Sequence, residues 1–374
     1  MAGSTFGEHF RITTWGESHG KGVGVVVDGC PAGLPLTPND IQVYLNRRKP
    51  GQSRFSTPRK EEDAVEILSG VFEGKTTGTP ISLMVSNENQ HSQDYSDIAS
   101  YYRPGHADYT FDMKYGFRDY QGGGRSSGRE TIGRVAAGAI ASKLLQTIGI
   151  SILTYSRAIG PVSLSFSAKD LLAQNVIELN DAIASSPLCM PDAMATDMAM
   201  NYLEDCMAHH NSAGGIIECI ICGVPAGLGD PVFDKLDADL AKAIFSIGAV
   251  KGFEIGDGFA AASSTGLENN DAFQMIGSKV VTSSNHSGGV LGGISNGSPI
   301  IFRAAIKPTP SIAAPQSTVN KEGESLTISI KGRHDPIIVP RAVVVVESMA
   351  ALVLVDALLE NMGSTLEKLI RHYL

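Results

Sequence analysis

The order of the predicted secondary-structure elements places the strongest constraint on the fold of this chain. Alternating apolar residues bounded by turn-forming residues predict strands at 10–14, 23–28, 64–71, 81–85, 150–155, 216–222, 300–306 and 326–331. Helical spacing and capping residues predict helices that begin at Thr37 and Ser127, that cover 192–209 and 234–246, and that follow Pro340. Predicted strands therefore occur in two groups, one before and one after most of the helical segments. Strands and helices do not alternate regularly as they do around a parallel sheet. This order favours an α+β fold.

Composition and apolar patterning indicate in which compartment a protein with this fold functions. Of the 374 residues, 43% are hydrophobic and 18% are charged, which is enough apolar material for a sizeable core. The N-terminus lacks the basic and then apolar pattern of a signal peptide. The longest apolar stretch, 342–359, is interrupted by Glu347, Ser348 and Asp356. We therefore expect a cytoplasmic enzyme that does not cross a membrane.

The five cysteines predict neither a disulfide framework nor a metal site. Their number is odd and they are sparse. Cys219 and Cys222 form a C-x-x-C pattern, but they lie in an apolar segment that predicts a buried strand, and no second pair accompanies them. Buried, unreactive thiols are the expected outcome.

Residues 122–134, GGGRSSGRETIGR, give the clearest indication of a ligand. Three glycines let the backbone approach a ligand closely, and Ser127 with Glu130 matches the S-x-x-E capping box at the start of a helix. The N–H groups of such a helix, together with Arg125, Arg129 and Arg134, suit a phosphate. The alternative is a capped helix with solvated arginines. The spacing matches neither a P-loop nor G-x-G-x-x-G.

The charge distribution favours a pocket for a small anion over a nucleic-acid surface. The net charge is -9, yet nine of the fifteen arginines lie between residues 47 and 134. A nucleic-acid-binding protein needs a broad basic face. A non-catalytic binding module built on the basic loop 47–60 remains an alternative function.

The pattern Gly16-Glu17-Ser18-His19-Gly20 permits a second alternative, a serine hydrolase with Ser18 as nucleophile. That reading requires a helix after the motif, and the residues that follow predict a strand. In an extended chain Ser18 and His19 would also point in opposite directions, so they would not form a local pair.

Three further motifs place chemistry-bearing residues at turns: His106 in RPGHAD, Lys307 in KPTPS and Asp335 in GRHDP. An extended chain would send Arg333 and Asp335 to the same side. Each motif could equally be a surface turn. Together with the arginines, they fit a substrate with several negative charges and a reaction that gives and takes a proton. Phosphate elimination from a carboxylated substrate is one such reaction.

Taken in order, these motifs resemble those of the chorismate synthase family. The resemblance rests on GESHG from Gly16, RRKPGQSR from Arg47, RPGHAD from Arg103, GGGRSSGRET from Gly122, GVPAGLG from Gly223, KGFEIGDGF from Lys251, SNHSGG from Ser284, GGISNG from Gly292, KPTPS from Lys307 and GRHDP from Gly332. It covers nearly the whole chain and implies a single domain, 1–374.

The resemblance implies an activity and an architecture. Members of the family convert 5-enolpyruvylshikimate 3-phosphate to chorismate and phosphate in a 1,4-elimination that needs reduced FMN without net redox change. Their fold is a β-α-β sandwich, in which antiparallel sheets enclose central helices, and they usually form homotetramers. Because no nucleotide-binding signature is present, we expect an external flavin reductant.

Site residues follow from the resemblance motif by motif. His19 would act as the acid at the leaving phosphate. His106 would protonate or stabilise the reduced flavin anion, and Asp335 would assist proton removal through flavin N5. The implied substrate-binding residues are Ser18, Arg48, Arg54, Arg103, Arg129 and Arg333. The implied flavin-binding residues are Arg125, Ser126, Ser127, Gly248, Ala249, Gly292, Lys307, Pro308, Thr309, Pro310, Ser311 and Arg333. Arg48 and Arg54 are assigned in some members to a reducing nucleotide, NADP, but their crowding near other anion-binding residues favours the substrate. No metal is implied.

Overall fold

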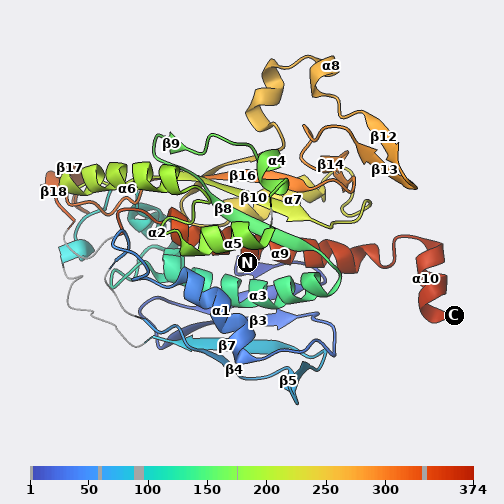
Figure 1. Cartoon of the computed structure of the whole chain (residues 1–374). Coiled ribbons are helices and arrows are strands. Elements are labelled where there is room, and N and C mark those ends of the chain that lie inside the picture. Colours follow the sequence, from blue (N-terminus) through green and yellow to red (C-terminus); the bar gives the residue numbers. More distant parts are fainter. Residues whose placement is uncertain (1–2, 58–60, 88–96, 175, 331–334) are drawn as a thin grey trace.

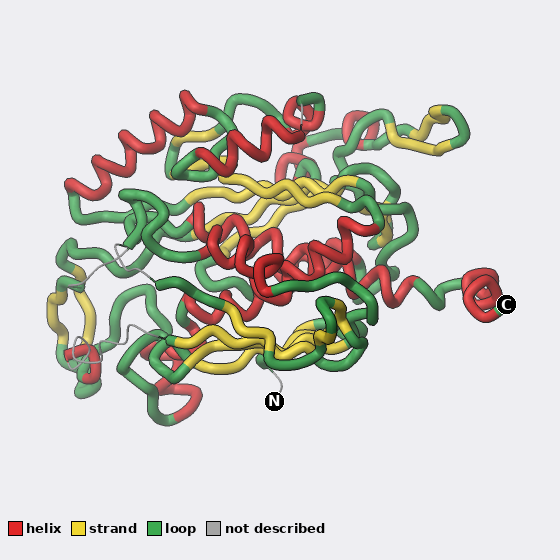
Figure 2. The backbone as a smooth tube through the Cα atoms, turned by 60° about the horizontal axis from the view of Figure 1, so that its bottom comes forward, coloured by secondary structure: helices red, strands yellow, loops and turns green. Residues whose placement is uncertain are grey.

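Two antiparallel five-stranded sheets enclose a layer of helices in the computed structural model, which describes residues 3–57, 61–87, 97–174, 176–330 and 335–374 (Figure 1). The first sheet has the order β1-β2-β3-β7-β4, with the bounds Thr5–Phe6, Arg11–Gly16, Gly22–Asp28, Ile81–Ser86 and Val65–Ile67. The second has the order β11-β16-β10-β8-β9, with the bounds Val250–Ile255, Ile300–Ile306, Gly215–Cys222, Ser151–Ile159 and Val162–Ser163. Figure 2 shows the helices between the two strand layers. The predicted α+β sandwich is confirmed.

The helical layer consists of α1 (Pro38–Arg48), α3 (Thr131–Thr147), α7 (Leu236–Phe245) and α9 (Val339–Asn361). Helix α3 packs against β2, β3 and β7 of the first sheet, and α9 packs against β8 and β10 of the second. The two helices also pack against each other. Both sheets therefore bury their inner faces on one shared layer, which joins the two halves of the core.

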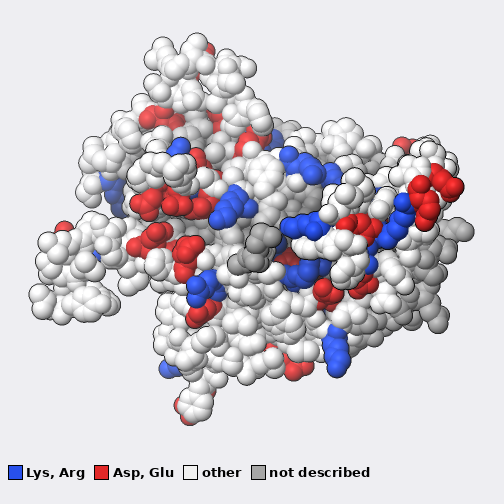
Figure 3. Space-filling model, turned by 180° about the vertical axis from the view of Figure 1, so that it is seen from behind, with Lys and Arg blue, Asp and Glu red and all other residues white. Residues whose placement is uncertain are grey.

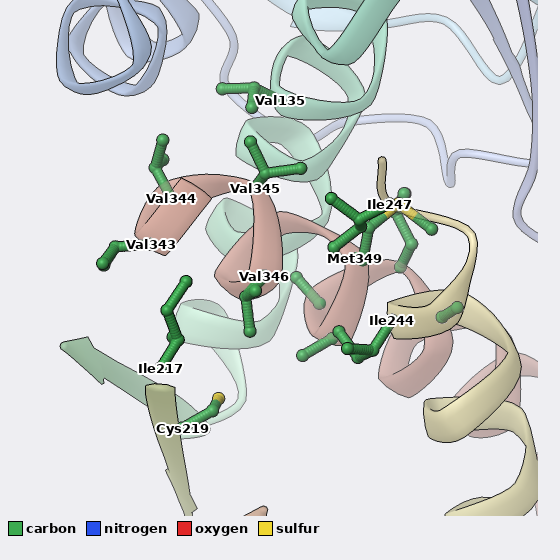
Figure 4. Close-up of a cluster of buried hydrophobic side chains, with 14 of the residues drawn as sticks. Val135, Ile217, Cys219, Ile244, Ile247, Val343, Val344, Val345, Val346 and Met349 are labelled. Atoms are coloured by element: carbon green, nitrogen blue, oxygen red, sulfur yellow. The ribbon is translucent and has the colours of Figure 1, made fainter. Parts of the chain in front are cut away.

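Helix α9 is apolar on nearly every side because it lies at the centre of this core. Val343–Val346 gather with Val135 of α3 and with Ile217 and Cys219 of β10 (Figure 4). By length and composition α9 could cross a membrane, but most of its apolar window is buried inside the fold. Burial of Cys219 also raises the pKa of its thiol, in agreement with an unreactive C-x-x-C.

A glycine lets α3 and α9 approach closely. Gly138 faces Ser348 of α9, and a Cβ added at Gly138 would overlap the side chain of that serine. Ser348 has little freedom to move, since its hydroxyl donates to the carbonyl oxygen of Val344 at 2.7 Å and the residue is fully buried. The spacing between the two central helices therefore depends on the missing side chain.

We expect Gly138→Ala to lower the free energy of unfolding by about 1–3 kcal/mol, because a packed core accepts an extra methyl group only by moving one helix. Denaturant unfolding measures the change. Gly266→Ala is the matched control, because a Cβ added there meets no atom within 4 Å. Its free energy of unfolding should stay within about 0.5 kcal/mol of the unmodified protein. Equal losses in the two variants would contradict the close contact between helices.

Further helices, strands and 3-10 turns complete the described part of the fold. They are α2 (Asp108–Tyr115), α4 (Ala168–Leu172), α5 (Val176–Ser185), α6 (Ala193–Ala208), α8 (Gly266–Asn269), α10 (Leu366–Tyr373), β5 (Val71–Phe72), β6 (Lys75–Thr76), β12 (Phe273–Ile276), β13 (Lys279–Thr282), β14 (Val290–Leu291), β15 (Ile294–Ser295), β17 (Gln316–Val319), β18 (Ser325–Ile328), and the 3-10 turns η2 (Asp97–Ala99), η3 (Gly124–Ser126), η4 (Gly128–Glu130) and η5 (Gly258–Ser263). Helix α10 extends away from the sandwich (Figure 1).

The structure corrects several predicted bounds. The strand predicted at 64–71 ends at Ile67, because Gly70 adopts a left-handed φ of 81° and turns the chain into the β5–β6 hairpin. The strand predicted at 326–331 is Ser325–Ile328. The helix predicted after Pro340 begins one residue before that proline, and sequence analysis missed α10 beyond it.

Candidate functional site

The turn between β2 and β3 carries Ser18 and His19 side by side. Their Oγ and Nδ1 atoms lie 3.0 Å apart, so the expectation that they point in opposite directions is wrong. The chain is not extended here: the backbone N–H of Gly20 donates to the carbonyl oxygen of Glu17 at 3.1 Å and closes a turn. A turn brings neighbouring side chains to one side, which an extended strand cannot do.

The glycine-rich motif lies directly against this turn. Gly122 contacts the imidazole of His19 so closely that an added Cβ would overlap the ring. Arg125 donates to the carbonyl oxygen of Gly16 at 2.9 Å and to that of Thr14 at 3.2 Å. Two motifs separated by about a hundred residues in the sequence are therefore parts of one cluster, which we call the His19 cluster.

The predicted capping box does not form. Ser127 caps the 3-10 turn η4 by accepting the backbone N–H of Arg129 at 3.2 Å. Glu130 does not reach back to Ser127. Its carboxylate accepts from the hydroxyl of Thr14 at 2.9 Å and from Nε of Arg134 at 2.8 Å. Tertiary partners thus outcompete the local cap, and α3 begins at Thr131 rather than at Ser127.

Two predicted substrate-binding arginines share the carboxylate of Asp63. Arg48 Nη1 and Arg129 Nη1 each lie 3.0 Å from one of its oxygens. Arg48 is 3% exposed and also donates to the carbonyl oxygen of Gly128 and the hydroxyl of Thr131. Burial lowers the pKa of Arg48 to about 10, so the guanidinium stays protonated at neutral pH. Arg48 acts here as an internal brace under the glycine-rich motif.

Asp335 joins the same network through a different arginine from the one predicted. Its carboxylate accepts from the backbone N–H of Thr57 at 2.7 Å and from Nη1 of Arg341 at 2.6 Å. Nε of Arg341 in turn donates to the carbonyl oxygen of Arg48 at 3.1 Å. The expected partner, Arg333, lies outside the described residues.

A second cluster, which we call the His106 cluster, joins the RPGHAD and KPTPS motifs. Nδ1 of His106 lies 3.0 Å from the carbonyl oxygen of Pro104, and Nε2 lies 2.9 Å from Oγ of Ser311. Because a carbonyl oxygen only accepts, Nδ1 carries the proton and Nε2 of the neutral ring accepts from Ser311. Burial, followed by the charge of Arg103, lowers the pKa of His106 below its ordinary value.

Arg103 and Lys307 complete the charge of this cluster. Arg103 forms a two-pronged pair with Asp108, at 2.8 and 2.7 Å, which starts helix α2. Lys307 donates from Nζ to the carbonyl oxygen of Gly105 at 2.8 Å. Burial and the neighbouring Lys251 lower the pKa of Lys307, so an anion placed beside this ammonium would stabilise it.

The 248–249 and 307–311 segments also meet. The backbone N–H of Lys307 donates to the carbonyl oxygen of Ala249 at 2.9 Å, and Ala249 holds a left-handed φ of 73°. A non-glycine residue in that region is uncommon and is typical of functional sites. Thr309 Oγ1 is buried and has no hydrogen-bond partner among the described residues. A buried hydroxyl without a partner fits a site that receives a polar ligand.

A short backbone bridge connects the two clusters. Ser212 donates from its hydroxyl to the carbonyl oxygen of Thr309 at 2.7 Å. The next residue, Ala213, donates from its backbone N–H to the carbonyl oxygen of Pro336 at 2.9 Å. Pro336 follows Asp335, so hydrogen bonds and the chain itself lead from the His106 cluster to Asp335 and from there to the His19 cluster. His19, His106 and Asp335 thus belong to one connected set of contacts.

Gly292 and Arg54 lie apart from these clusters, whereas Gly248 adjoins Ala249 and Ser126 belongs to the glycine-rich motif. Gly292 turns the β14–β15 hairpin beside the start of α7, whereas Gly248 follows its end. The ten-residue helix separates them by about 15 Å. Arg54 is exposed and pairs with Glu204 of α6. Ser126 is exposed and donates to the carbonyl oxygen of Gly123 at 2.7 Å.

Three arginines of the basic loop form ion pairs within the protein. Arg47 pairs with the buried Glu347 at 2.5 Å, and Arg48 and Arg54 pair with Asp63 and Glu204. On the face in Figure 3, basic side chains are interspersed with acidic ones. A hollow of about 90 Å³ beside Arg129 is lined by Ser86 and by the acidic residues Glu61, Glu62, Asp63 and Glu66.

Sequence analysis missed Asp63, Asn87 and Arg341, which connect the predicted residues to one another. Asp63 is the last of three consecutive acidic residues, which are typical of a solvated segment that offsets the charge of the basic loop. Its left-handed φ of 48° cannot be inferred from those residues. Asn87 follows a strand in a polar segment typical of a surface turn. Arg341 lies inside the first turn of α9. None of the three forms part of a recognisable motif.

Comparisons with known proteins identify the family. A sequence model described as chorismate synthase matches residues 10–359. The chain is 66% identical over 376 residues to the chorismate synthase of Agathobacter rectalis, a match that covers 100% of this chain and 99% of that protein. It is 54% identical over 362 residues to the chorismate synthase of Methanosarcina mazei, with 96% and 97% covered. A crystal structure of a chorismate synthase superposes with a TM-score of 0.77 at 33% identity, and the match covers 98% of this chain and 97% of that one.

This agreement extends over nearly the whole length of the protein, in sequence and in fold. It excludes the serine hydrolase and the non-catalytic binding module as readings of the motifs. The chain belongs to the chorismate synthase family, the lyases of the shikimate pathway that release phosphate from 5-enolpyruvylshikimate 3-phosphate to form chorismate for aromatic amino-acid biosynthesis.

Proposed function

We propose that the His19 and His106 clusters are the two halves of the active site in which this chorismate synthase carries out the elimination. The observation that carries the proposal is a continuous set of contacts. It leads from the turn that carries His19 through Asn87 to Arg129. It continues through Asp63, Arg48, Arg341 and Asp335 to the bridge at Ser212 and Ala213. Such a set fixes the proton-transfer groups relative to one another.

We propose reduced FMN as the cofactor, held by the His106 cluster. Lys307 and the unpaired hydroxyl of Thr309 suit anionic and polar groups of a flavin nucleotide, and the left-handed Ala249 lies beside them. When bound, reduced flavin supplies transient electron density that allows an allylic phosphate to leave. Pro308, Pro310 and Ser311 belong to the same segment as Lys307 and Thr309. The other residues for which the resemblance implies flavin contact include Arg125, Ser126 and Ser127, which belong to the glycine-rich motif of the His19 cluster.

The protein's own groups would supply binding and protons. Arg129 and Arg103 offer guanidinium groups to the carboxylates and phosphate of the substrate, since planar forks match those oxygens. His19 would give a proton to the departing phosphate. The carboxylate of Asp335 would assist removal of the proton that the substrate ring loses. We further propose a cytoplasmic homotetramer whose flavin is reduced by an external donor.

The test is phosphate release from 5-enolpyruvylshikimate 3-phosphate by the purified protein, measured anaerobically with FMN that has been reduced chemically or left oxidised. We expect turnover with reduced FMN alone and no net oxidation of the flavin. A spectrophotometric titration should also show that substrate tightens flavin binding. Equal phosphate release with oxidised FMN would refute the proposed cofactor role, and no release under either condition would refute the active site.

A further inference from the structure

The side chain of Asn87, which follows β7, contacts both the His19 turn and a predicted substrate-binding arginine. Its Nδ2 atom donates to the carbonyl oxygen of Glu17 at 2.9 Å and to that of Gly20 at 2.8 Å. Its Oδ1 atom accepts from Nε of Arg129. One amide group therefore holds both ends of the turn that carries His19 and connects them to Arg129.

These three contacts require a primary amide. Two carbonyl oxygens need two N–H donors, and the guanidinium of Arg129 needs an acceptor. Among side chains, only Asn and Gln carry both in one planar group. The backbone N–H of Asn87 also donates to the carbonyl oxygen of Lys21 at 3.0 Å, which anchors the amide at its base.

The glycine-rich motif makes further contacts with the turn and with the residue that precedes it. Arg125 holds the carbonyl oxygen of Gly16, and Gly122 packs against the imidazole ring of His19. The imidazole ring of His19 therefore has the backbone of Gly122 on one side. On the other side is its own turn, which Asn87 holds in place. Loss of the amide contacts would release only the second of these restraints.

We propose that Asn87 is a positioning residue of the elimination: it fixes the turn 17–20, and through that turn the imidazole of His19, relative to Arg129. The inference rests on the roles proposed above for His19 and Arg129. Both must act on one phosphorylated substrate, and a misplacement of about 1 Å in a reacting group costs on the order of 100-fold in rate.

The variant Asn87→Asp separates the two functions of the amide. A carboxylate keeps the size of the side chain and an acceptor for Arg129, but it turns an oxygen rather than a donor toward the carbonyls of Glu17 and Gly20. We expect kcat to fall by about 10- to 100-fold. The KM for 5-enolpyruvylshikimate 3-phosphate should stay within about threefold, because Arg129 keeps its partner. In Asn87→Ala, kcat should fall and KM should rise.

Asn320→Asp is the matched control. The half-buried Asn320 also closes a turn through both atoms of its amide, which contact the backbone N–H and the carboxylate of Glu324 at 2.7 and 2.8 Å. It contacts neither cluster, so its kcat and KM should equal those of the unmodified protein. Thermal unfolding of each variant shows whether a change in kcat follows from loss of the fold.

A double-mutant cycle with His19→Ala tests whether Asn87 acts through His19. The double variant His19→Ala/Asn87→Asp should have the kcat of His19→Ala alone, because a misplaced turn no longer matters once the imidazole is gone. If Asn87→Asp unfolds, Asn87→Ala gives the same cycle without a new charge.

Independent losses that multiply in the double variant would overturn the inference, as would an unchanged kcat in Asn87→Asp. A failure of the proposed function looks different: the unmodified protein and Asn320→Asp would then also release no phosphate with reduced FMN.

Discussion

Replacement of His106 by alanine should lower the rate of phosphate release by about 10- to 10,000-fold and leave the protein folded, the range expected when acid–base assistance is lost. The structure gives the reason. Nδ1 is bound to the carbonyl oxygen of Pro104, so Nε2, which faces Ser311, is the atom that can exchange a proton. Phosphate release under reduced FMN, with circular dichroism to confirm folding, measures the effect.

Two variants distinguish proton exchange from packing. His106→Asn can keep the contact with Pro104 through its amide nitrogen but cannot exchange a proton near neutral pH. We expect it to be impaired as strongly as His106→Ala. Ser311→Ala removes only the hydroxyl beside Nε2 and should cost less. An asparagine variant with the unmodified rate would show that His106 is a packing residue.

The lowered pKa of His106 also predicts how stability depends on pH. The unfolded chain binds a proton near pH 6.5, whereas the folded protein binds it only at lower pH. The stability linked to this group is therefore fully present above about pH 6.5 and is lost as the pH falls through the folded pKa. His106→Ala should lose less stability than the unmodified protein between about pH 7 and pH 5. Denaturant unfolding at several pH values provides the comparison.

Gly122→Ala should reduce activity by about 100-fold or more, approaching the loss in His19→Ala. A Cβ at this position would overlap the imidazole of His19, with Nδ1 as the nearest atom. The ring must then leave its place beside Ser18, because the backbone of the glycine-rich motif is itself held by Arg125 at Gly16. The rate of phosphate release measures the change.

Gly363→Ala provides the comparison for this prediction. A Cβ added at Gly363 meets no atom within 4 Å, and the residue lies beyond the end of α9, far along the chain from both clusters. Its activity should match that of the unmodified protein. If Gly122→Ala keeps full activity with an unchanged KM, then His19 does not act from the position described here.

Several elements of the sandwich could be predicted because their signals are local. Helix α6 begins at the Asp192 cap, as expected for 192–209, and β16 matches the predicted strand 300–306 residue for residue. Alternation of apolar residues needs no distant partner to be read. The strand expected at 64–71 ends early because Gly70 takes a left-handed φ of 81°, which the alternation of apolar residues does not reveal.

In the candidate site, too, local motifs identified some residues, whereas the contacts between them depended on the tertiary structure. Motif resemblance pointed to His19, His106 and Asp335 because each lies in a short distinctive segment. It could not reveal that Asp335 pairs with Arg341, that Glu130 serves Thr14 and Arg134 in place of a helix cap, or that Ser18 and His19 share a turn. In each case a partner remote in sequence, or a turn closed by the backbone, decided the outcome.

The amino-acid sequence by itself determined the strand and helix order, the α+β class and the family, because periodicity and ordered motifs are properties of the chain alone. The tertiary structure decided which carboxylate each arginine pairs with, how Gly122 confines His19, and how Asn87 connects that turn to Arg129. The physical reason is that a buried charge or amide must find partners wherever the packed chain supplies them, and those partners lie at distances in the sequence that no local pattern encodes.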